Sequence, residues 1–280
     1  MNDVSAAPLR LPALLRALQG VEFPHKLGIC ERLFARRLAV EGIRWTPTAP
    51  GPLWKLDLAN STHRWIVYGD YEGPGFWRWL RAHAGQVGSV VDSGANIGQT
   101  VLYFSALLPR ARILAYEPGS TARAWLEEGV ARNRFARVTV EPRGLGAAAG
   151  RAGLAAVGEG SLHGSWNRIG GTGGEPVEIA PLDDELDRHG LAALDLWKLD
   201  VEGYVAEALR GARRSLASGR IRALHLELDD SSDEGAALLR EHRYSAWDLT
   251  PSGRPVPLGR TRRWGNALFL APGHPAAPNP

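Results

Sequence analysis

The sequence predicts an α/β fold in which a doubly wound, mostly parallel sheet carries helices on both faces. Three observations predict it. From about residue 88 onward, short apolar runs alternate with segments of helical periodicity. Two of the early apolar runs end in a carboxylate, Asp92 and Glu117, as strands do at the ligand-binding edge of such sheets. The chain has 280 residues, of which 44% are hydrophobic, enough for a sizeable core.

The first part of the chain has a different character. Residues 8–40 carry leucines at helical spacing, which predicts one or two amphipathic helices interrupted by Pro24. Residues 44–80 are rich in tryptophan, and within them Leu53–Leu58 and Arg64–Tyr68 have the pattern of short strands. The predicted division is an N-terminal helical and Trp-containing extension, a main domain and a disordered Pro-rich tail, residues 1–65, 66–270 and 271–280.

Strands and helices alternate through the main domain. The predicted strands are Ser89–Asp92, Ile113–Tyr116, Val138–Val140, Leu194–Leu199 and Ile221–Leu228, and a closing antiparallel pair, Ser245–Leu249 and Ala267–Leu270. The predicted helices are Gln99–Leu108, Thr121–Asn133 and Val205–Leu216, with one more after the strand that ends at Leu228. Residues 144–176 are Gly-rich, which predicts a hairpin and a flexible loop.

Composition excludes several classes of protein. Cys30 is the only cysteine, so no intrachain disulfide, Cys-rich zinc site or cysteine-ligated iron–sulfur cluster can form. The formal net charge is +3 and the whole excess lies in residues 1–44, so no nucleic-acid partner is expected. The N-terminus lacks a signal-peptide pattern and no apolar run reaches the length of a membrane span, so we expect a cytoplasmic protein. The oligomeric state stays open.

The strongest motif is VVDSGANIGQT, which contains a strand end, a glycine turn and a helix start. Gly94 and Gly98 let the backbone approach a ligand closely, because a side chain there would clash. Asn96 stands where a dinucleotide fingerprint has its middle glycine, and the Lys-Ser/Thr pair of a phosphate loop is missing. The turn therefore suits a cofactor without a pyrophosphate. S-adenosylmethionine fits, because its amino acid end can meet Asp92 and the turn amides.

A second carboxylate, Glu117 in AYEPGS, ends the next strand, and Pro118 stops that strand. At this position a carboxylate can accept hydrogen bonds from both ribose hydroxyls of a nucleotide cofactor. The alternative is a solvated loop carboxylate. Because Asp92 and Glu117 each end an apolar strand of the same sheet, we favour the cofactor role.

A third group of charged residues surrounds the end of the strand in LWKLDVEG. Alternation along a strand points Lys198 and Asp200 to one side, with Glu202 just beyond. Glu227 ends the following strand. Their position at the carboxyl edge predicts a catalytic constellation. An ion-pair network that only shapes the rim of the site is the alternative, above all for Lys198 and Glu227.

Together these segments resemble the FkbM family of S-adenosylmethionine-dependent methyltransferases. The matching motifs, in chain order, are Asp-X-Gly-Ala-Asn-X-Gly at 92–98, Glu-Pro at 117–118, Asn133, Gly-Ser-Leu at 160–162, Leu-Asp-Asp at 182–184, Lys-X-Asp-X-Glu-Gly at 198–203 and Gly-Ala at 211–212. The resemblance covers about residues 66–270. It implies a Rossmann-like class I methyltransferase sheet, whereas the small N-terminal helical and β extension, residues 1–65, matches no family motif. The cofactor residues that we expect are Asp92, Gly94, Ala95, Asn96, Gly98, Glu117 and Pro118.

The family implies O-methylation of a sugar, polyketide or other secondary metabolite, so we expect a small-molecule or glycan acceptor. The transfer needs a base for the hydroxyl proton. Asp200 is the first candidate and His163 the second, with Lys198 beside them. A divalent metal bridging Asp200 and Glu227 is left open, and no metal ligand is assigned. Ser93 replaces the commoner Val, and Tyr204 begins a departure from the usual Ala-Glu that is expected to alter the acceptor pocket.

Two alternatives remain at this point. The acceptor can be an amine of a small molecule or peptide, or the chain can be a non-catalytic cofactor-binding module. Loss of a cofactor carboxylate would favour the second alternative, and neither is lost. The Trp-rich segment 44–80 and the Gly-rich loop 157–175 are expected to frame the acceptor pocket, with Trp77, Trp79 and Trp166 as the residues to test.

Overall fold

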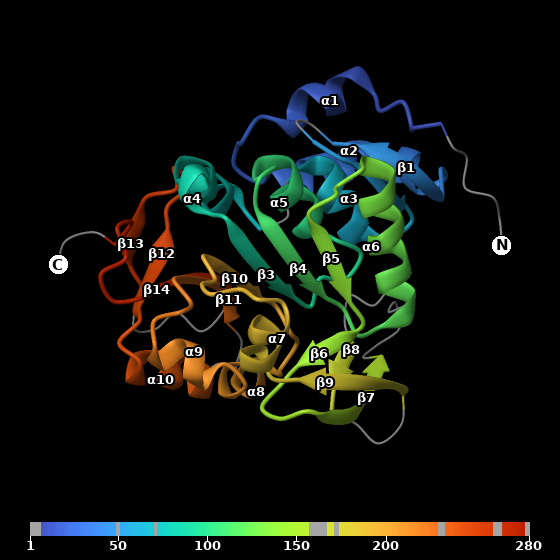
Figure 1. Cartoon of the computed structure of the whole chain (residues 1–280). Coiled ribbons are helices and arrows are strands. Elements are labelled where there is room, and N and C mark those ends of the chain that lie inside the picture. The colour runs from blue at the N-terminus through green and yellow to red at the C-terminus, as the bar shows by residue number, and fades with distance from the viewer. Residues whose placement is uncertain are drawn as a thin grey trace.

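The computed structural model describes most of the chain (Figure 1). The described residues are 7–48, 51–69, 72–156, 167–170, 174–228, 233–259 and 265–277. Among their helices, none combines the length and the apolar character needed to cross a membrane.

The described residues form a central eight-stranded sheet with the strand order β13-β12-β14-β11-β10-β3-β4-β5. Its strands are β3 (Ser89–Ser93), β4 (Arg112–Tyr116), β5 (Val138–Glu141), β10 (Leu196–Leu199), β11 (Ala223–Leu228), β12 (Ser245–Leu249), β13 (Pro255–Pro257) and β14 (Gly265–Leu270). The five strands from β5 to β11 run parallel, whereas β14, β12 and β13 pair antiparallel. This arrangement confirms the predicted Rossmann-like sheet and its closing antiparallel pair. The strand order reverses between β3 and β10, which makes that boundary the switch point of the fold.

Helices cover both faces of the sheet, as predicted (Figure 1). One face packs against α4 (Pro74–His83), α5 (Val101–Leu107) and α6 (Ser120–Asn133), and the short 3-10 helix η1 (Ala84–Gln86) follows α4. The other face packs against α7 (Leu182–Arg188), α8 (Val205–Arg210), α9 (Arg213–Ala217) and α10 (Asp233–Glu241). Neighbouring strand residues divide between the two: Val90 lies in the first core and Val91 in the second.

A small second sheet lies beside the carboxyl ends of β4 and β5 (Figure 1). It has the strand order β6-β9-β7-β8. Its strands are β6 (Arg143–Leu145), β7 (Gly150–Ala156), β8 (Asn167–Ile169) and β9 (Glu175–Ala180). The Gly-rich region therefore contains more strand than the predicted hairpin.

The N-terminal extension folds onto α5 and α6. Its elements are α1 (Ala13–Gln19), α2 (Lys26–Ala39), β1 (Ile43–Pro47), β2 (Leu53–Asp57) and α3 (Ser61–Tyr68). Their apolar side chains share one core with Ile97, Leu102 and Trp125 of the main domain. Asn133 fastens the two parts, because its side chain accepts a hydrogen bond from Leu53 N at 2.8 Å and donates one to Leu53 O at 2.7 Å.

The prediction of a strand at Arg64–Tyr68 is wrong, because these residues belong to α3. Asn60 accepts a hydrogen bond from Thr62 N and starts the helix, and Gly69 in the left-handed conformation ends it. The β-branched residues Ile66 and Val67 favour a strand locally, yet both are fully buried against α1 and α2. Tertiary burial thus overrides local propensity here.

The helix predicted at Val205–Leu216 is two helices, α8 and α9, with a break at Gly211–Ala212. A Cβ at Gly211 would overlap the carbonyl oxygen of Gly146, so the chain packs backbone against backbone at the break. Asp183 then caps α9, accepting hydrogen bonds from Arg214 N at 2.8 Å and Ser215 N at 2.9 Å.

The described part of the Pro-rich tail, for which disorder was predicted, forms hydrogen-bonded turns. His274 N donates to Ala271 O at 3.1 Å and Ala277 N donates to His274 O at 3.0 Å. Ala276 and Ala277 are half-buried against the α4–α5 core. These contacts supply a reason for residues 271–277 to adopt one conformation.

Candidate functional site

A pocket of about 350 Å³ opens at the carboxyl edge of the central sheet. We call it the edge pocket. Gly94 after β3, Glu117 after β4, Asp200 after β10 and Glu227 in β11 all line it. Ligands of open α/β sheets bind at this edge beside the switch point. The structure thus brings the three sequence motifs together in one cavity.

The glycine turn is held by backbone hydrogen bonds to the end of β4 and within itself. Gly94 N and Ala95 N donate to Tyr116 O at 3.0 and 3.1 Å, and Gly98 N donates to Ala95 O at 2.8 Å. Gly94 has a φ of 76°, and a Cβ there would overlap the carbonyl oxygen of Asp200. Ala95 is buried, whereas Gly94 and Asn96 line the edge pocket. The turn therefore presents a close-packed backbone to any ligand.

Gly98 serves helix packing rather than the pocket wall. Its φ is 96°, and a Cβ there would lie 2.9 Å from Leu126 Cδ1 and 3.3 Å from Leu102 Cγ. The glycine lets α5 approach α6. Gly98 contributes to a ligand site only indirectly, because its positive φ sets the backbone conformation of the turn.

Glu117 lines the pocket with both carboxylate oxygens bound to backbone amides. Asn96 N donates to Oε2 and Gly119 N donates to Oε1, each at 2.8 Å. Burial raises the pKa of Glu117 to about 7, although the two amide donors lower it. Pro118 lines the pocket beside it. The carboxylate is thus fixed in position by the turn that it faces.

Asp92 lies beneath the turn rather than in the pocket. Its side chain is 1% exposed and accepts a hydrogen bond from Thr100 Oγ1 at the start of α5. Burial raises its pKa to about 7, while Lys198 lowers it. The carboxylate therefore ties β3 to α5 and is not among the residues that line the edge pocket.

Lys198 lies behind the pocket wall, buried in a row of polar side chains. The strand register places it beside Asp92 of β3 and His225 of β11. Its ammonium lies 3.1 Å from Asp200 Oδ2 and 3.0 Å from Glu72 Oε1. Burial alone would lower the pKa of Lys198, but these carboxylates raise it above the ordinary value, so it is an ammonium at neutral pH. The prediction that Lys198 and Asp200 share one side is confirmed.

Asp200 and Glu227 form a hydrogen-bonded carboxyl pair at the pocket mouth. The hydrogen bond and the charge of Asp200 raise the pKa of Glu227 to about 9. Burial would raise the pKa of Asp200, but Lys198 and the hydrogen bond from Glu227 hold it below the usual range. The two carboxyls therefore titrate as a coupled pair, in which the proton is bound more tightly on the Glu227 side.

Glu202 joins this pair, with carboxylate oxygens of the three residues within 4.8 Å of one another. That spacing and the oxygen donors suit a divalent cation. The Lys198 ammonium already places a positive charge on Asp200. Lys198 thus offsets part of the negative charge of this cluster, and it shares its ammonium with Glu72.

The N-terminal extension contributes to the pocket through Leu27, Thr62 and Trp65. The expectation that Trp77 and Trp79 frame this pocket is wrong. Trp79 is 2% exposed and both side chains pack in the core beneath α4. His163 and Trp166, with most of the loop 157–175, lie outside the described residues.

Sequence reasoning singled out neither Glu72 nor Asn266, although both line the pocket. Trp65 also lines it and belongs to the Trp-rich segment 44–80 that was expected to frame the acceptor pocket, although Trp65 was not among the residues chosen for testing. Tyr204 also lines it, in agreement with the expected effect of that departure on the pocket. Ser93 has a partner of its own, because Trp197 Nε1 donates to Ser93 Oγ at 2.8 Å. The only signal for Glu72 was its acidic side chain in the segment before Pro74.

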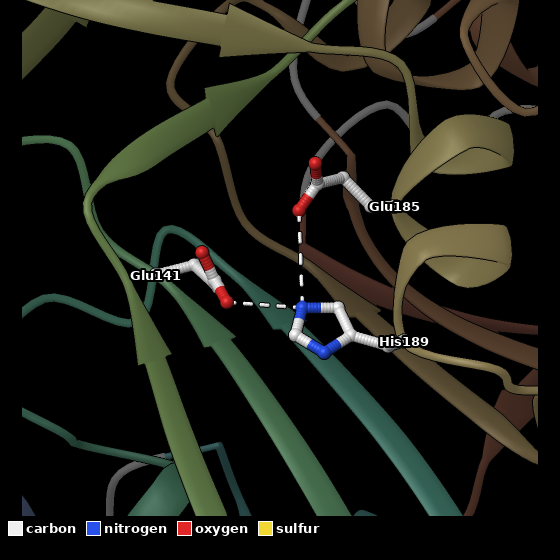
Figure 2. Close-up of side chains that lie close together, drawn as sticks. All are labelled: Glu141, Glu185 and His189. Atoms are coloured by element: carbon white, nitrogen blue, oxygen red, sulfur yellow. Dashed lines mark ion pairs between the residues drawn. The ribbon is translucent and has the colours of Figure 1, made fainter.

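A second cluster of titratable groups lies outside the edge pocket. In Figure 2, His189 Nε2 faces Glu141 of β5 and Glu185 of α7, at 2.9 and 4.0 Å. Arg188 lies 2.7 Å from Glu141 and 2.6 Å from Glu185. Arg112 donates to His189 Nδ1 at 3.3 Å, which leaves the ring proton on Nε2. The cluster is an ion-pair network that joins α7 to the sheet.

Comparisons with known proteins were made for the whole chain. Residues 92–247, more than half of it, match the family model described as Methyltransferase FkbM domain. The chain is 31% identical over 153 residues to methyltransferase sdnD of Sordaria araneosa, a stretch that covers 44% of this chain and 59% of that protein. The chain therefore spans less than two thirds of this curated relative.

Two solved structures resemble the chain at lower identity. One is methyltransferase FkbM from Methylobacillus flagellatus KT, at 20% identity and a TM-score of 0.49, covering 76% of this chain and 52% of that one. The other is the METTL16 MTase domain, at 14% identity and a TM-score of 0.45, covering 92% of this chain and 79% of that one.

Proposed function

The chain belongs to the FkbM methyltransferase family, and we propose that it transfers the methyl group of S-adenosylmethionine to a hydroxyl of a small-molecule or glycan acceptor. The position of Asp200 carries this proposal. Its carboxylate is held beside the Lys198 ammonium and lines the same pocket as Gly94 and Glu117. A proton acceptor and a nucleotide site thus share one cavity. Sugars, polyketides and other secondary metabolites are the acceptor classes that we favour.

The edge pocket has groups that fit an adenosyl cofactor. Each Glu117 oxygen accepts one amide hydrogen and keeps a lone pair for a ribose hydroxyl. Asn96 Oδ1 is buried without a hydrogen-bond partner among the described residues. Because Asp92 is buried and the first turn amides are already bonded, the amino acid end of the cofactor meets the side chains of Asn96 and Gln99 in this proposal.

S-adenosylmethionine supplies a methyl group on a positively charged sulfur. Asp200 orients the acceptor hydroxyl by accepting its hydrogen bond, which holds the oxygen at attack distance. With the cofactor bound, its methyl group would pass from the sulfur to the acceptor oxygen, and Asp200 would take the hydroxyl proton. Glu227 holds the pair's first proton and Lys198 keeps Asp200 ionised before the transfer.

An amine acceptor is the second candidate, and the charge of the pocket favours it. Five carboxyl-bearing residues line the described wall, and no Lys or Arg is among them. They are Glu72, Glu117, Asp200, Glu202 and Glu227. Such a wall attracts a cationic ligand, either the sulfonium or an ammonium group. The nature of the labelled product decides between the two acceptors.

The test is incubation with methyl-labelled S-adenosylmethionine and an extract of the producing cell, followed by identification of the labelled product. We expect a methyl ether on a small molecule or glycan, and a labelled amine would favour the second candidate. Calorimetry on the purified chain comes first. Binding of NAD without binding of S-adenosylhomocysteine would contradict the cofactor assignment. Binding of S-adenosylhomocysteine without any methyl transfer would favour a non-catalytic cofactor-binding module.

A further inference from the structure

Glu72 lies in the short segment between α3 and α4, outside the residues that match the family. Its φ is 60°, in the left-handed region that residues other than Gly seldom adopt. The side chain is 3% exposed yet forms part of the pocket wall. A strained backbone and a buried carboxylate at a ligand site both need surrounding contacts to hold them.

Those contacts come from three strands of the central sheet. Glu72 Oε1 lies 3.0 Å from Lys198 Nζ of β10. Glu72 Oε2 accepts a hydrogen bond from Asn266 Nδ2 of β14 at 3.0 Å and lies 3.5 Å from His225 Nδ1 of β11. Phe76, four residues on, stacks on the His225 ring at 3.7 Å. The Glu72 side chain is therefore held by contacts with three neighbouring strands of the sheet.

The Lys198 ammonium sits between two carboxylates, Glu72 on one side and Asp200 on the other. A lysine side chain has a flexible four-carbon stem, so one partner leaves its ammonium free to rotate. Two partners, one of them the buried Glu72, fix the position of the ammonium. Asp200 is partly exposed at the pocket mouth, and its Oδ2 is then held by a donor that cannot move.

We propose that Glu72 is a positioning residue for methyl transfer, which holds the Asp200 carboxylate at the methyl-transfer position by fixing Lys198. This inference rests on the proposed function. Glu72 touches the ammonium rather than the reacting atoms. A residue that lies before the family-matched segment, which begins at residue 92, thereby completes the catalytic edge of the domain.

Substitution of Glu72 separates charge from shape. In Glu72→Gln one of the two oxygen positions becomes an NH2 group that donates instead of accepting, so either Lys198 at Oε1 or Asn266 at Oε2 loses its acceptor. Glu72→Asp keeps the charge and shortens the side chain by one methylene. Asp195→Asn is the matched control, because Asp195 accepts bonds from Gly88 N and Ser89 N at the opposite end of β3 and β10.

The readout is a ligand preference that needs no acceptor. Sinefungin carries an amine at the place of the transferred methyl group, so its affinity relative to S-adenosylhomocysteine reports the Asp200 carboxylate. We expect the wild type to prefer sinefungin by about tenfold to a hundredfold, the effect of one hydrogen bond between charged groups. Glu72→Gln and Asp200→Asn should each lose most of that preference, and Glu72→Asp part of it.

The control should keep the full preference even where its melting temperature falls. Full wild-type preference in both Glu72 variants overturns the inference. Equal affinity of the wild type for the two ligands also overturns it, because Asp200 then does not face the methyl position. A wild type that binds neither ligand contradicts the proposed function itself. With an acceptor in hand, Glu72→Gln should lower kcat and leave the KM for S-adenosylmethionine unchanged.

Discussion

Gly94 and Asp200 pack backbone against backbone at the switch point of the sheet. A Cβ on Gly94 would overlap the carbonyl oxygen of Asp200, and Asp200 N donates to Ser93 O at 3.1 Å. The glycine turn and the segment that carries Asp200 are therefore packed as one unit. A change in the turn must also move Asp200.

Gly94→Ala is expected to impair folding and cofactor binding together. The new methyl group meets the Asp200 carbonyl, and the φ of 76° is strained for alanine, so we expect a loss of about 1–3 kcal/mol in unfolding free energy. Gly28→Ala in α2 is the control, since a Cβ there meets nothing within 4 Å. It should stabilise by roughly 0.5–1 kcal/mol. Equal denaturation midpoints for both variants would refute this reasoning.

Cofactor affinity is expected to rise with pH through the titration of Glu117. The pKa of Glu117 is raised from 4.5 to about 7 by burial, and only the ionised form accepts both ribose hydroxyls. Affinity for S-adenosylhomocysteine should be about tenfold weaker at pH 6 than at pH 8. Glu117→Gln removes this component, and the mutation should weaken binding by about 1–3 kcal/mol at pH 8. Calorimetry at both pH values checks this prediction. If the affinity of the wild type and of Glu117→Gln changes equally between the two pH values, Glu117 is not the cause.

The raised pKa of Glu117 has the opposite effect on the stability of the cofactor-free protein, which falls as pH rises. A carboxyl whose pKa is raised on folding binds protons better when folded, so stability falls as pH rises from about 4.5 to 7 and then levels off. Asp92, with its pKa raised to about 7, adds to this slope. In Glu117→Gln, the melting temperature measured without cofactor should fall less steeply with rising pH than it does in the wild type.

Asp200→Asn is expected to reduce turnover far more than cofactor affinity. Asparagine keeps the shape but cannot accept the proton, and loss of a general base costs about 10²–10⁴-fold in rate. Lys198 keeps its second partner, Glu72, so folding should be retained. Single-turnover rates and S-adenosylhomocysteine binding are compared with the wild type. Near wild-type turnover would place the base elsewhere, and His163→Ala becomes the next variant.

Trp65 and Trp79 are expected to respond differently to truncation. Trp65 is 38% exposed and lines the edge pocket, so Trp65→Ala should alter a ligand constant with little loss of stability. Trp79 is buried, so Trp79→Ala should cost about 3–5 kcal/mol without a specific effect on ligands. Melting temperature, cofactor affinity and the acceptor KM are measured for both. A Trp65 variant that loses only stability would show that the side chain is structural.

Removal of divalent cations is expected to leave methyl transfer unchanged. Asp200, Glu202 and Glu227 can hold a cation, but Lys198 already supplies a positive charge at Asp200. Turnover is measured with EDTA and after addition of Mg²⁺ or Mn²⁺. Loss of activity with EDTA and its recovery with Mg²⁺ would show that the three carboxylates bind a catalytic metal.

The sequence by itself determined the central sheet and the glycine turn. Strand runs, helix periodicity and the need for glycine at Gly94 are local properties, so they can be read from neighbouring residues. The carboxylates at the ends of β3 and β4 follow from the same pattern. Local reading failed at Arg64–Tyr68, where burial of Ile66 and Val67 outweighed their strand propensity.

Only the tertiary structure decided which groups act together. Asp92 belongs to the strongest motif yet lies beneath the turn, whereas Glu72 belongs to none and holds Lys198. The charge states of Asp200 and Glu227 likewise depend on burial and on Lys198. Burial and electrostatic contacts are properties of the packed chain, because they join residues that are far apart in sequence.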